Sequence, residues 1–433
     1  MKYISKKLAL STVSFSAVVL LGAVASMTGA CTITSTDNSD GGVFDNDAGN
    51  ADGASLAQPT LPFQPSNVTI VGHDLSQIGD ANITSDCTLD TSATDLSGGE
   101  CLGPDVEWIA TQTDGTQAHV FAVSSLTVAQ TAKLTVSGGL PAIIISIHDV
   151  TLLGPVLANA KYDAAGPGGF SQKTSFTKGS GPGGGGAAIK SGGTPDSENG
   201  AVAGISGGGG GFCGAGGQGV GEGMSDTGVG AVTTAIPAAA SPYGTPELRP
   251  LVGGSAGGVG GLSSAGSGGG AIQIVAGGTF TLGSLASINV GGGGGSDSGE
   301  TNAGQEASGG GSGGAILIEA TTATISGVLA ANGGGGGAKD GNGQDATPDA
   351  NPALGGTDNS TAAGGPGGAA AVQNGTNGVV PAGQFAAGAG GGGAGRIRIN
   401  TATGAATLTG VVSPAASTPC VSQGSLRGAD AGI

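Results

Sequence analysis

Residues 309–337 read GGGSGGAILIEATTATISGVLAANGGGGG, and residues 265–295 read AGSGGGAIQIVAGGTFTLGSLASINVGGGGG. Each stretch places a short apolar island between two runs of glycine. Within the island, an Ile-x-Ile segment is followed by a small or polar turn. A second segment then has an apolar residue at every other position. This period of two predicts β-strands rather than helices.

The same order recurs along the chain. Three islands of thirteen residues align without a gap, and a fourth keeps the order with a few extra residues: Ala142–Gly154, Ala271–Gly283, Ala315–Gly327 and Gly395–Gly410. A third short apolar stretch follows each island. Three short strands joined by tight turns make a coil of about 20 to 25 residues, the size of a solenoid rung. We therefore predict an all-β parallel solenoid.

In such a solenoid, equivalent side chains of successive coils stack on each other. Ile272 and Ile274 would contact the coil that begins at Ala315, whereas Gln273 and Leu317 would point outward. We expect the glycine runs at the corners, where the chain turns with positive φ or leaves as a long loop. Two alternatives stay open. The islands could belong to an unrelated sandwich with glycine linkers, or the GGGG tracts could pack as polyglycine-II helices with three residues per turn.

The repeated order is a glycine run, an apolar strand pair and then TLxG or TISG. This order resembles the right-handed parallel β-helix exoproteins of the pectin-lyase-like type. In particular, it is similar to Gly-rich β-helix lipoproteins of Gram-negative bacteria. The resemblance covers about residues 130–415. It implies a right-handed parallel β-helix with long Gly-rich loops. It implies no single activity, because this fold hosts lyases, hydrolases, adhesins and inert stalks.

The N-terminus has the order of a secretory signal: three lysines in MKYISKK, then an uncharged and mostly apolar stretch from Leu8 to Val24. The signal ends in MTGAC at residues 27–31, which resembles the bacterial lipobox. We therefore predict that Cys31 is lipidated, so that acyl chains such as palmitate anchor the protein to a membrane. Thr32 favours the outer membrane by analogy with that family. The alternative is ordinary cleavage near Ala30.

The composition divides the rest of the chain. After the signal peptide 1–30, residues 31–65 are acidic and poor in apolar side chains, which predicts a flexible tether. Residues 66–137 alternate apolar and polar residues and are expected to form a small N-terminal β cap. Only 14 of the 95 glycines lie in the first 150 residues. The segment 138–433 is therefore assigned to the Gly-rich β-helix.

The charge and the cysteines restrict the partners and the compartment. The formal net charge is −17, and no Lys or Arg occurs between Leu8 and Ala132. Nucleic acid is excluded as a partner because phosphate backbones need basic residues. Four cysteines remain besides Cys31, and an even number in an exported protein predicts two disulfides. Three pairings are open. Cys87–Cys101 is favoured because it closes a short loop. The remaining pair is then Cys213–Cys420.

Few residues carry chemistry. Arg396 and Arg398 alternate with isoleucines and form either a solvated face or a contact for an anionic glycan. Asp340 and Asp345 lie in DGNGQDAT, which resembles one copy of a tandem Ca²⁺-binding nonapeptide, so they are weak metal candidates. Loosely bound Ca²⁺ is the one ion that the acidic composition suggests. We assign no catalytic residue, and we expect the isolated His119 at the surface or in a turn.

These observations predict an exported lipoprotein that is outer-membrane-anchored or extracellular. Its predicted role is non-enzymatic, structural or adhesive, with contacts to extracellular polysaccharide or neighbouring cells. The alternative is a β-helix lyase or hydrolase acting on a polysaccharide. A third hypothesis is ice or mineral binding by a flat threonine ladder, of which Thr279 and Thr322 supply a partial row. The sequence does not indicate an oligomeric state.

Overall fold

The computed structural model describes residues 60–92, 96–103, 105–189, 204–225, 228–231, 239–261, 264–298, 306–358, 362–380 and 387–428. The predicted signal peptide, Cys31 and the tether up to residue 59 lie outside these residues. The regular secondary structure of the described part is almost entirely β, with strands β1 to β22 and one short 3-10 helix, η1 (Glu100–Leu102). Within it, no helix has the length and apolar character needed to cross a membrane.

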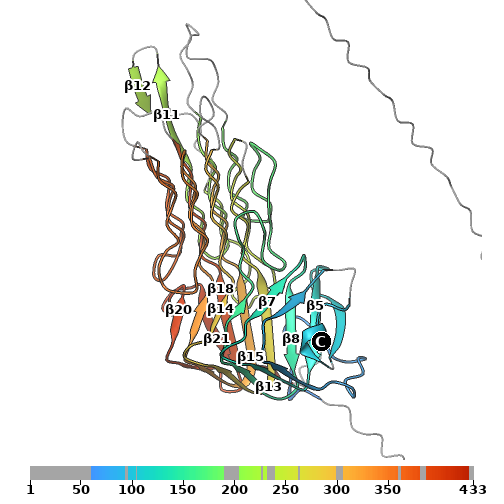
Figure 1. Ribbon diagram of the computed structural model, residues 1–433. Helices are drawn as coiled ribbons and strands as arrows, with labels where there is room; N and C mark the ends of the chain where they lie inside the picture. Colours follow the sequence, from blue (N-terminus) through green and yellow to red (C-terminus); the bar gives the residue numbers. More distant parts are fainter. Residues whose placement is uncertain are drawn as a thin grey trace, which may run out of the picture. The chain divides into compact units, whose positions relative to one another are not determined.

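Strands from successive islands lie side by side and run parallel in three strips (Figure 1). The first strip contains β5 (Gln117–Val123), β8 (Ala142–Ser146), the first halves of β13 (Ala271–Leu282) and β15 (Ala315–Ile325), β18 (Arg396–Thr401) and β21 (Val421–Ser425). The second contains β2 (Asp80–Ile83), β6 (Ser125–Val128), β9 (Val150–Leu152), the second halves of β13 and β15, and β19 (Thr407–Leu408). The third contains β3 (Cys87–Asp90), β7 (Leu134–Ser137), β10 (Val156–Leu157), β14 (Ser287–Asn289), β16 (Val328–Ala330) and β20 (Val411–Ser413).

The register between the two middle islands is the predicted one. Ile272 pairs with Ile316, and Ile274 pairs with Ile318. All four side chains are buried in the core enclosed by the three strips. Because parallel neighbours repeat the same apolar positions, their side chains form continuous apolar rows on the core face of the strip.

The predicted alignment of the first island is wrong by one residue. Ala142 pairs with Ile272 rather than with Ala271. A slip of one residue moves every side chain of a strand to the opposite face of the sheet. Ile144 therefore faces the enclosed core, whereas Ile143 and Ile145 pack in a second core on the other side of the sheet.

The face that we expected to be solvated is buried as well. Gln273 and Leu317 have no exposed surface. The second core covers this side of the first strip and is made partly of Leu61, Phe63 and Leu251, which come from outside the islands. The first strip is thus buried on both faces, as is common for parallel strands.

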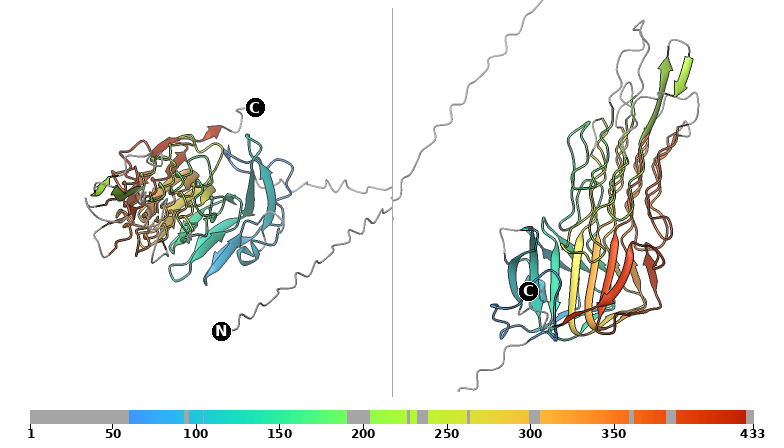
Figure 2. Two further views of the ribbon diagram at one scale, coloured as in Figure 1. Left: turned by 90° about the horizontal axis from the view of Figure 1, so that it is seen from above. Right: turned by 180° about the vertical axis from the view of Figure 1, so that it is seen from behind.

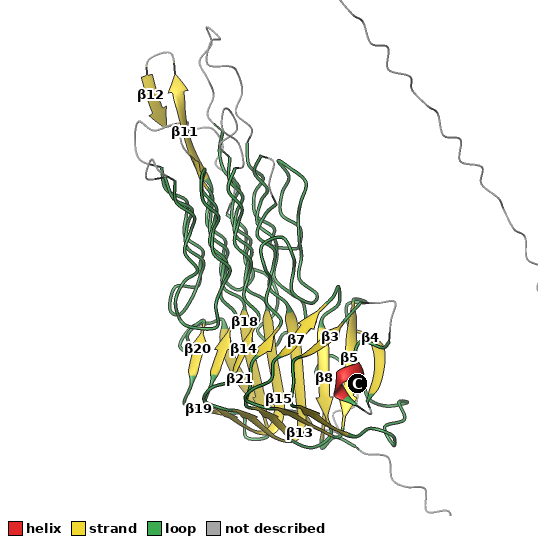
Figure 3. Ribbon diagram, in the orientation of Figure 1, coloured by secondary structure: helices red, strands yellow, loops and turns green. Residues whose placement is uncertain are grey.

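The prediction of a single right-handed parallel β-helix is wrong. The strands form separate sheets of eleven, six, three and two strands, and the chain does not wind continuously from coil to coil (Figure 3). Several pairs are antiparallel: β4 (Val106–Thr111) with β5, β1 (Phe63–Gln64) with β22 (Arg427–Gly428), and β11 (Val220–Ser225) with both β12 (Gly228–Ala231) and β17 (Ala387–Gly388). After β10, β14 and β16 the chain leaves the sheets. The physical reason is that the glycine runs bond to each other instead of turning corners.

The segment 66–137 supplies strands β2 to β7, and five of them pair in parallel within the three strips. The sixth, β4, runs antiparallel along β5. It therefore covers a strand edge that could otherwise pair with another chain.

Candidate functional site

Three stretches of the chain connect successive strands of the sheets: residues 158–270, 291–314 and 331–395. The residues of these stretches that the structure describes form a second layer, here called the glycine bundle. Its segments run away from the sheets in a tight array (Figures 1 and 2). Few of its residues belong to strands, yet the backbone is densely hydrogen-bonded between segments that are distant in sequence. This bundle is the most distinctive feature of the described chain.

The hydrogen bonds of the bundle repeat every three residues. From residue 309 to residue 314, successive N–H groups donate in turn to three different neighbouring segments, at 2.8–3.0 Å. The donor–acceptor pairs are Gly309–Gly258 and Ser312–Ser255, then Gly310–Gly390 and Gly313–Gly393, then Gly311–Gly293 and Gly314–Val290. A period of three is the period of the polyproline-II type of helix. The polyglycine-II packing that the sequence left open is therefore present in the bundle.

Glycine is required in the bundle because the backbones approach too closely for a side chain. A Cβ atom on Gly258 would lie 1.8 Å from the carbonyl oxygen of Gly186, and one on Gly309 would lie 2.0 Å from that of Gly208. Neither residue is among the glycines with positive φ. Positive φ is therefore not the reason for glycine at these two positions, although Gly168, Gly181 and Gly244 elsewhere in the bundle do have positive φ. The requirement is steric.

Serine hydroxyls replace some of the backbone acceptors. Ser312 Oγ accepts the N–H of Ser255 at 2.8 Å, and Ser255 Oγ accepts the N–H of Gly183 at 3.0 Å. Ser308 Oγ similarly accepts the N–H of Gly260 at 2.9 Å. These serines are fully buried. Their hydroxyl groups satisfy amides that the three-residue pattern leaves without a carbonyl partner.

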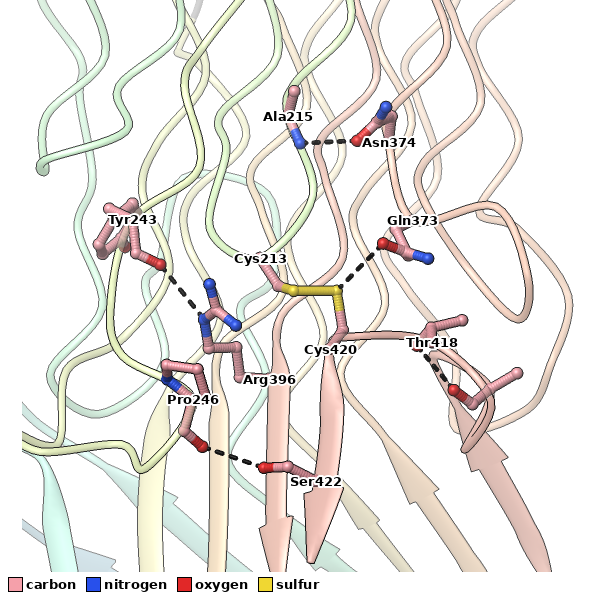
Figure 4. Close-up of a disulfide and its surroundings, with 11 residues drawn as sticks. Cys213, Ala215, Tyr243, Pro246, Gln373, Asn374, Arg396, Thr418, Cys420 and Ser422 are labelled. Carbon is pink, nitrogen blue, oxygen red and sulfur yellow. Dashed lines mark hydrogen bonds between the residues drawn. A yellow bond between two sulfur atoms is a disulfide. The ribbon is translucent and has the colours of Figure 1, made fainter.

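A disulfide between Cys213 and Cys420 ties the bundle to the start of β21 (Figure 4). The second disulfide joins Cys87 to Cys101. This is the pairing that loop length favours. It attaches the short 3-10 helix to β3 at one edge of the sheets.

The two arginines proposed as a glycan contact are engaged inside the protein. Arg396 Nε donates to the carbonyl of Tyr243 at 3.3 Å (Figure 4). Its guanidinium lies 6.0 Å from the centre of the Phe212 ring. Burial lowers the pKa of Arg396. Arg398 Nε donates to Asn400 Oδ1 at 2.7 Å. Both side chains are partly buried; the Arg396 contact joins the first strip to the bundle, and the Arg398 contact stays within β18.

The two metal candidates, Asp340 and Asp345, have different surroundings. Asp340 is exposed in a turn, whereas Asp345 Oδ1 accepts the N–H groups of Tyr162 at 2.9 Å and Gly294 at 2.8 Å. Asp345 therefore joins three segments of the bundle. Among the described residues, no group of three or more His, Cys, Asp or Glu side chains could hold a metal ion.

A buried carboxylate, which the sequence reasoning did not single out as a site, fastens the N-terminal part of the described chain to the sheets. Ser66 donates to Glu319 through its N–H (2.8 Å, to Oε2) and its hydroxyl (2.6 Å, to Oε1). Gln273 Nε2 and Asn400 Nδ2 donate to the same carboxylate at 2.7 Å and 3.1 Å. Glu319 is fully buried. Four donors on its two oxygens satisfy the charge that burial would otherwise penalise.

We expect Glu319→Gln to lower the free energy of unfolding by about 2 kcal/mol, because an amide NH₂ would face donors in place of an acceptor. Urea denaturation measures this loss. The exposed Glu247 is the matched control, and Glu247→Gln should change stability by less than about 0.5 kcal/mol. Equal effects of the two substitutions would show that the buried network contributes nothing.

A second titratable cluster lies at the hairpin formed by β4 and β5. His119 is fully buried rather than at the surface, and its Nε2 lies 2.9 Å from Glu107 Oε2. The imidazole stacks on the Phe121 ring at 4.4 Å. Burial and the neighbouring Glu107 raise the pKa of Asp105 to about 6. Sequence reasoning missed this cluster, because the hairpin pairing that brings Glu107 close to His119 has no local signature.

The raised pKa of Asp105 predicts a pH dependence of stability. The folded protein binds this proton more tightly than the unfolded chain, so the contribution is present below about pH 4 and is lost as pH rises through about 6. Asp105→Asn should therefore stabilise the protein at pH 8 by about 1 kcal/mol, a modest gain because solvent screens the charge of this half-buried group. At pH 3.5 the variant and the parent should be equal. Denaturation curves at the two pH values test this, and a variant that gains nothing at pH 8 contradicts it.

Comparisons with known protein families, with curated proteins and with solved structures return no match to this chain.

Proposed function

We propose that this chain is a non-enzymatic protein of the bacterial cell surface: a lipoprotein of a Gram-negative cell with a structural or adhesive role. The bundle is the observation that supports it. Segments such as 309–314 are bonded to three neighbours through the main chain. Such an array is stiff and presents few reactive side chains, which suits a projecting scaffold better than a catalytic groove.

The pairing of the first and last described strands supports the same proposal. Strand β1 pairs with β22, with Phe63 opposite Gly428, so the described chain begins and ends beside the sheets (Figure 1). A lipid on Cys31 would be connected through the acidic segment to β1, which belongs to the strands and not to the bundle. The bundle would then be free to contact glycans or a neighbouring cell.

The anchor is tested by Cys31→Ser in a Gram-negative host. We expect the unaltered chain in the outer-membrane fraction and the variant in the soluble periplasmic or extracellular fraction. Cys213→Ser is the control for loss of a cysteine as such and should stay with the membrane. Retention of the Cys31→Ser variant in the membrane contradicts the lipoprotein proposal.

The adhesive role is tested by screening residues 32–433 on a glycan array with and without Ca²⁺. Retention of the protein without release of sugar supports the proposal. Release of oligosaccharide products supports a polysaccharide lyase or hydrolase instead. If neither occurs, and cells carrying the protein adhere to each other no better than cells without it, the adhesive role is wrong.

A further inference from the structure

Five threonines stand in register across the second strip, one on each of five neighbouring strands. They are Thr127 (β6), Thr151 (β9), Thr281 (β13), Thr324 (β15) and Thr407 (β19), and each is the direct pairing partner of the next. We call them the threonine row. The sequence pointed instead to Thr279 and Thr322, which pair with each other in a neighbouring row, because the strand register that aligns these five is a tertiary feature.

The threonine row faces away from the enclosed core. On either side of it along the strands, apolar residues such as Leu126, Val150 and Phe280 point inward and are completely or almost completely buried. Thr324 and Thr407 are exposed, and the other three members are half-buried. The inward side chains therefore hold the threonines on a packed support, so that the row is preorganised rather than flexible.

The hydroxyl groups of the row are available to an external partner. Within the part of the chain that the structure describes, no side-chain hydrogen bond involves any of the five. The neighbouring row differs: Thr322 Oγ1 donates to Thr279 Oγ1 at 3.1 Å, and Asp149 Oδ1 accepts the N–H of Thr279 at 2.7 Å. The threonine row thus presents five unused hydroxyls, each beside a methyl group.

We propose that the threonine row binds the surface of ice. Neighbouring strands lie about 4.8 Å apart, which sets the repeat of the hydroxyls. In ice, each water is bonded tetrahedrally at about 2.75 Å, so waters that share a neighbour lie about 4.5 Å apart. The two repeats differ by a few tenths of an ångström per step. Several hydroxyls can therefore take lattice positions at once.

The chemistry of the row favours ice over the other periodic partners. All five members are neutral, so a mineral surface of charged ions finds no counter-charge in the row. A crystalline polysaccharide would be expected to stack its sugar rings on aromatic side chains. Among the described residues, the exposed large aromatic side chain is Tyr162, which lies in the glycine bundle and not on this strip. Regular hydroxyl and methyl groups without charge match a lattice of water.

The test is inhibition of ice recrystallisation by residues 32–433, which contain the whole compact unit Leu56–Ile433. We expect the unaltered chain to slow the growth of ice grains at micromolar concentration. Thr324→Lys and Thr151→Lys should each require at least a tenfold higher concentration, because a long charged side chain lifts the row from the lattice. The matched control is Thr88→Lys, which alters an exposed strand threonine on β3, outside the row.

Circular dichroism and the melting temperature establish that each variant is folded. Equal loss of activity in the Thr88 and Thr324 variants would overturn the proposal, as would an unaltered chain that acts no better than serum albumin. Co-sedimentation with crystalline cellulose or chitin, together with no effect on ice, would assign the row to a polysaccharide and also overturn it. Loss confined to the two row variants supports it.

Discussion

Gly258→Ala is expected to lower the free energy of unfolding by about 3 kcal/mol or more. The new methyl group would start 1.8 Å from the carbonyl oxygen of Gly186, which is a backbone atom and cannot rotate away. Overpacking of this kind costs about 1–3 kcal/mol in side-chain cores, and a rigid main-chain neighbour places the cost at the upper end. The bundle would have to separate locally and lose hydrogen bonds. Urea denaturation followed by circular dichroism measures the change.

Gly139→Ala is the matched control for Gly258→Ala. A Cβ atom on Gly139 would have no heavy atom within 4 Å, and Gly139 is not among the glycines with positive φ. The same methyl group should therefore be neutral or slightly stabilising there, through the entropy of the unfolded chain. If both substitutions have the same effect, steric exclusion is not the reason for glycine in the bundle.

Removing the Cys213–Cys420 disulfide by Cys213→Ser with Cys420→Ser is expected to cost about 5 kcal/mol. The two residues are 207 positions apart in sequence, so the bond removes a large loop entropy from the unfolded chain. The bond also joins the bundle to β21, and the variant should expose the bundle to protease before the sheets unfold. Denaturation curves and limited proteolysis under oxidising conditions measure both effects.

The Cys87–Cys101 bond is the internal comparison. Its separation of 14 residues predicts a smaller loss, about 3 kcal/mol, when both cysteines are replaced by serine. If the short-range pair turned out to stabilise the fold more than the long-range pair, the loop-entropy account would fail. Strain in the native bonds would then dominate.

The periodicity of the islands was sufficient to predict parallel pairing of Ile272 with Ile316 and of Ile274 with Ile318. The local pattern of apolar residues did not predict the strand register where two registers bury almost equally apolar faces. AIIIS at 142–146 is apolar on both faces, so the sequence could not distinguish Ile143 from Ile144 as the residue facing the enclosed core. The structure selects Ile144 because a second core, partly from residues 61–63 and 248–251, needs Ile143 and Ile145.

The buried clusters were beyond the reach of sequence reasoning for a related reason. Glu319 is held by Ser66, which is 253 residues away, and His119 meets Glu107 across a hairpin. No local signature predicts such contacts, since each residue alone looks like an ordinary polar residue of a strand or turn. The contact of Arg396 with Tyr243 could not be predicted for the same reason, because it depends on the path of a distant loop.

By itself, the sequence determined that the islands are strands with equivalent apolar positions, that two disulfides are available, and that the chain has almost no basic surface for nucleic acid. Only the tertiary structure decided where the glycines go and what they do. A run of glycines has no side chain to express a preference, so its conformation depends on which backbones lie beside it. Here the run at 309–314 finds three neighbours, and such amide hydrogen bonds replace the corners that a solenoid would have required.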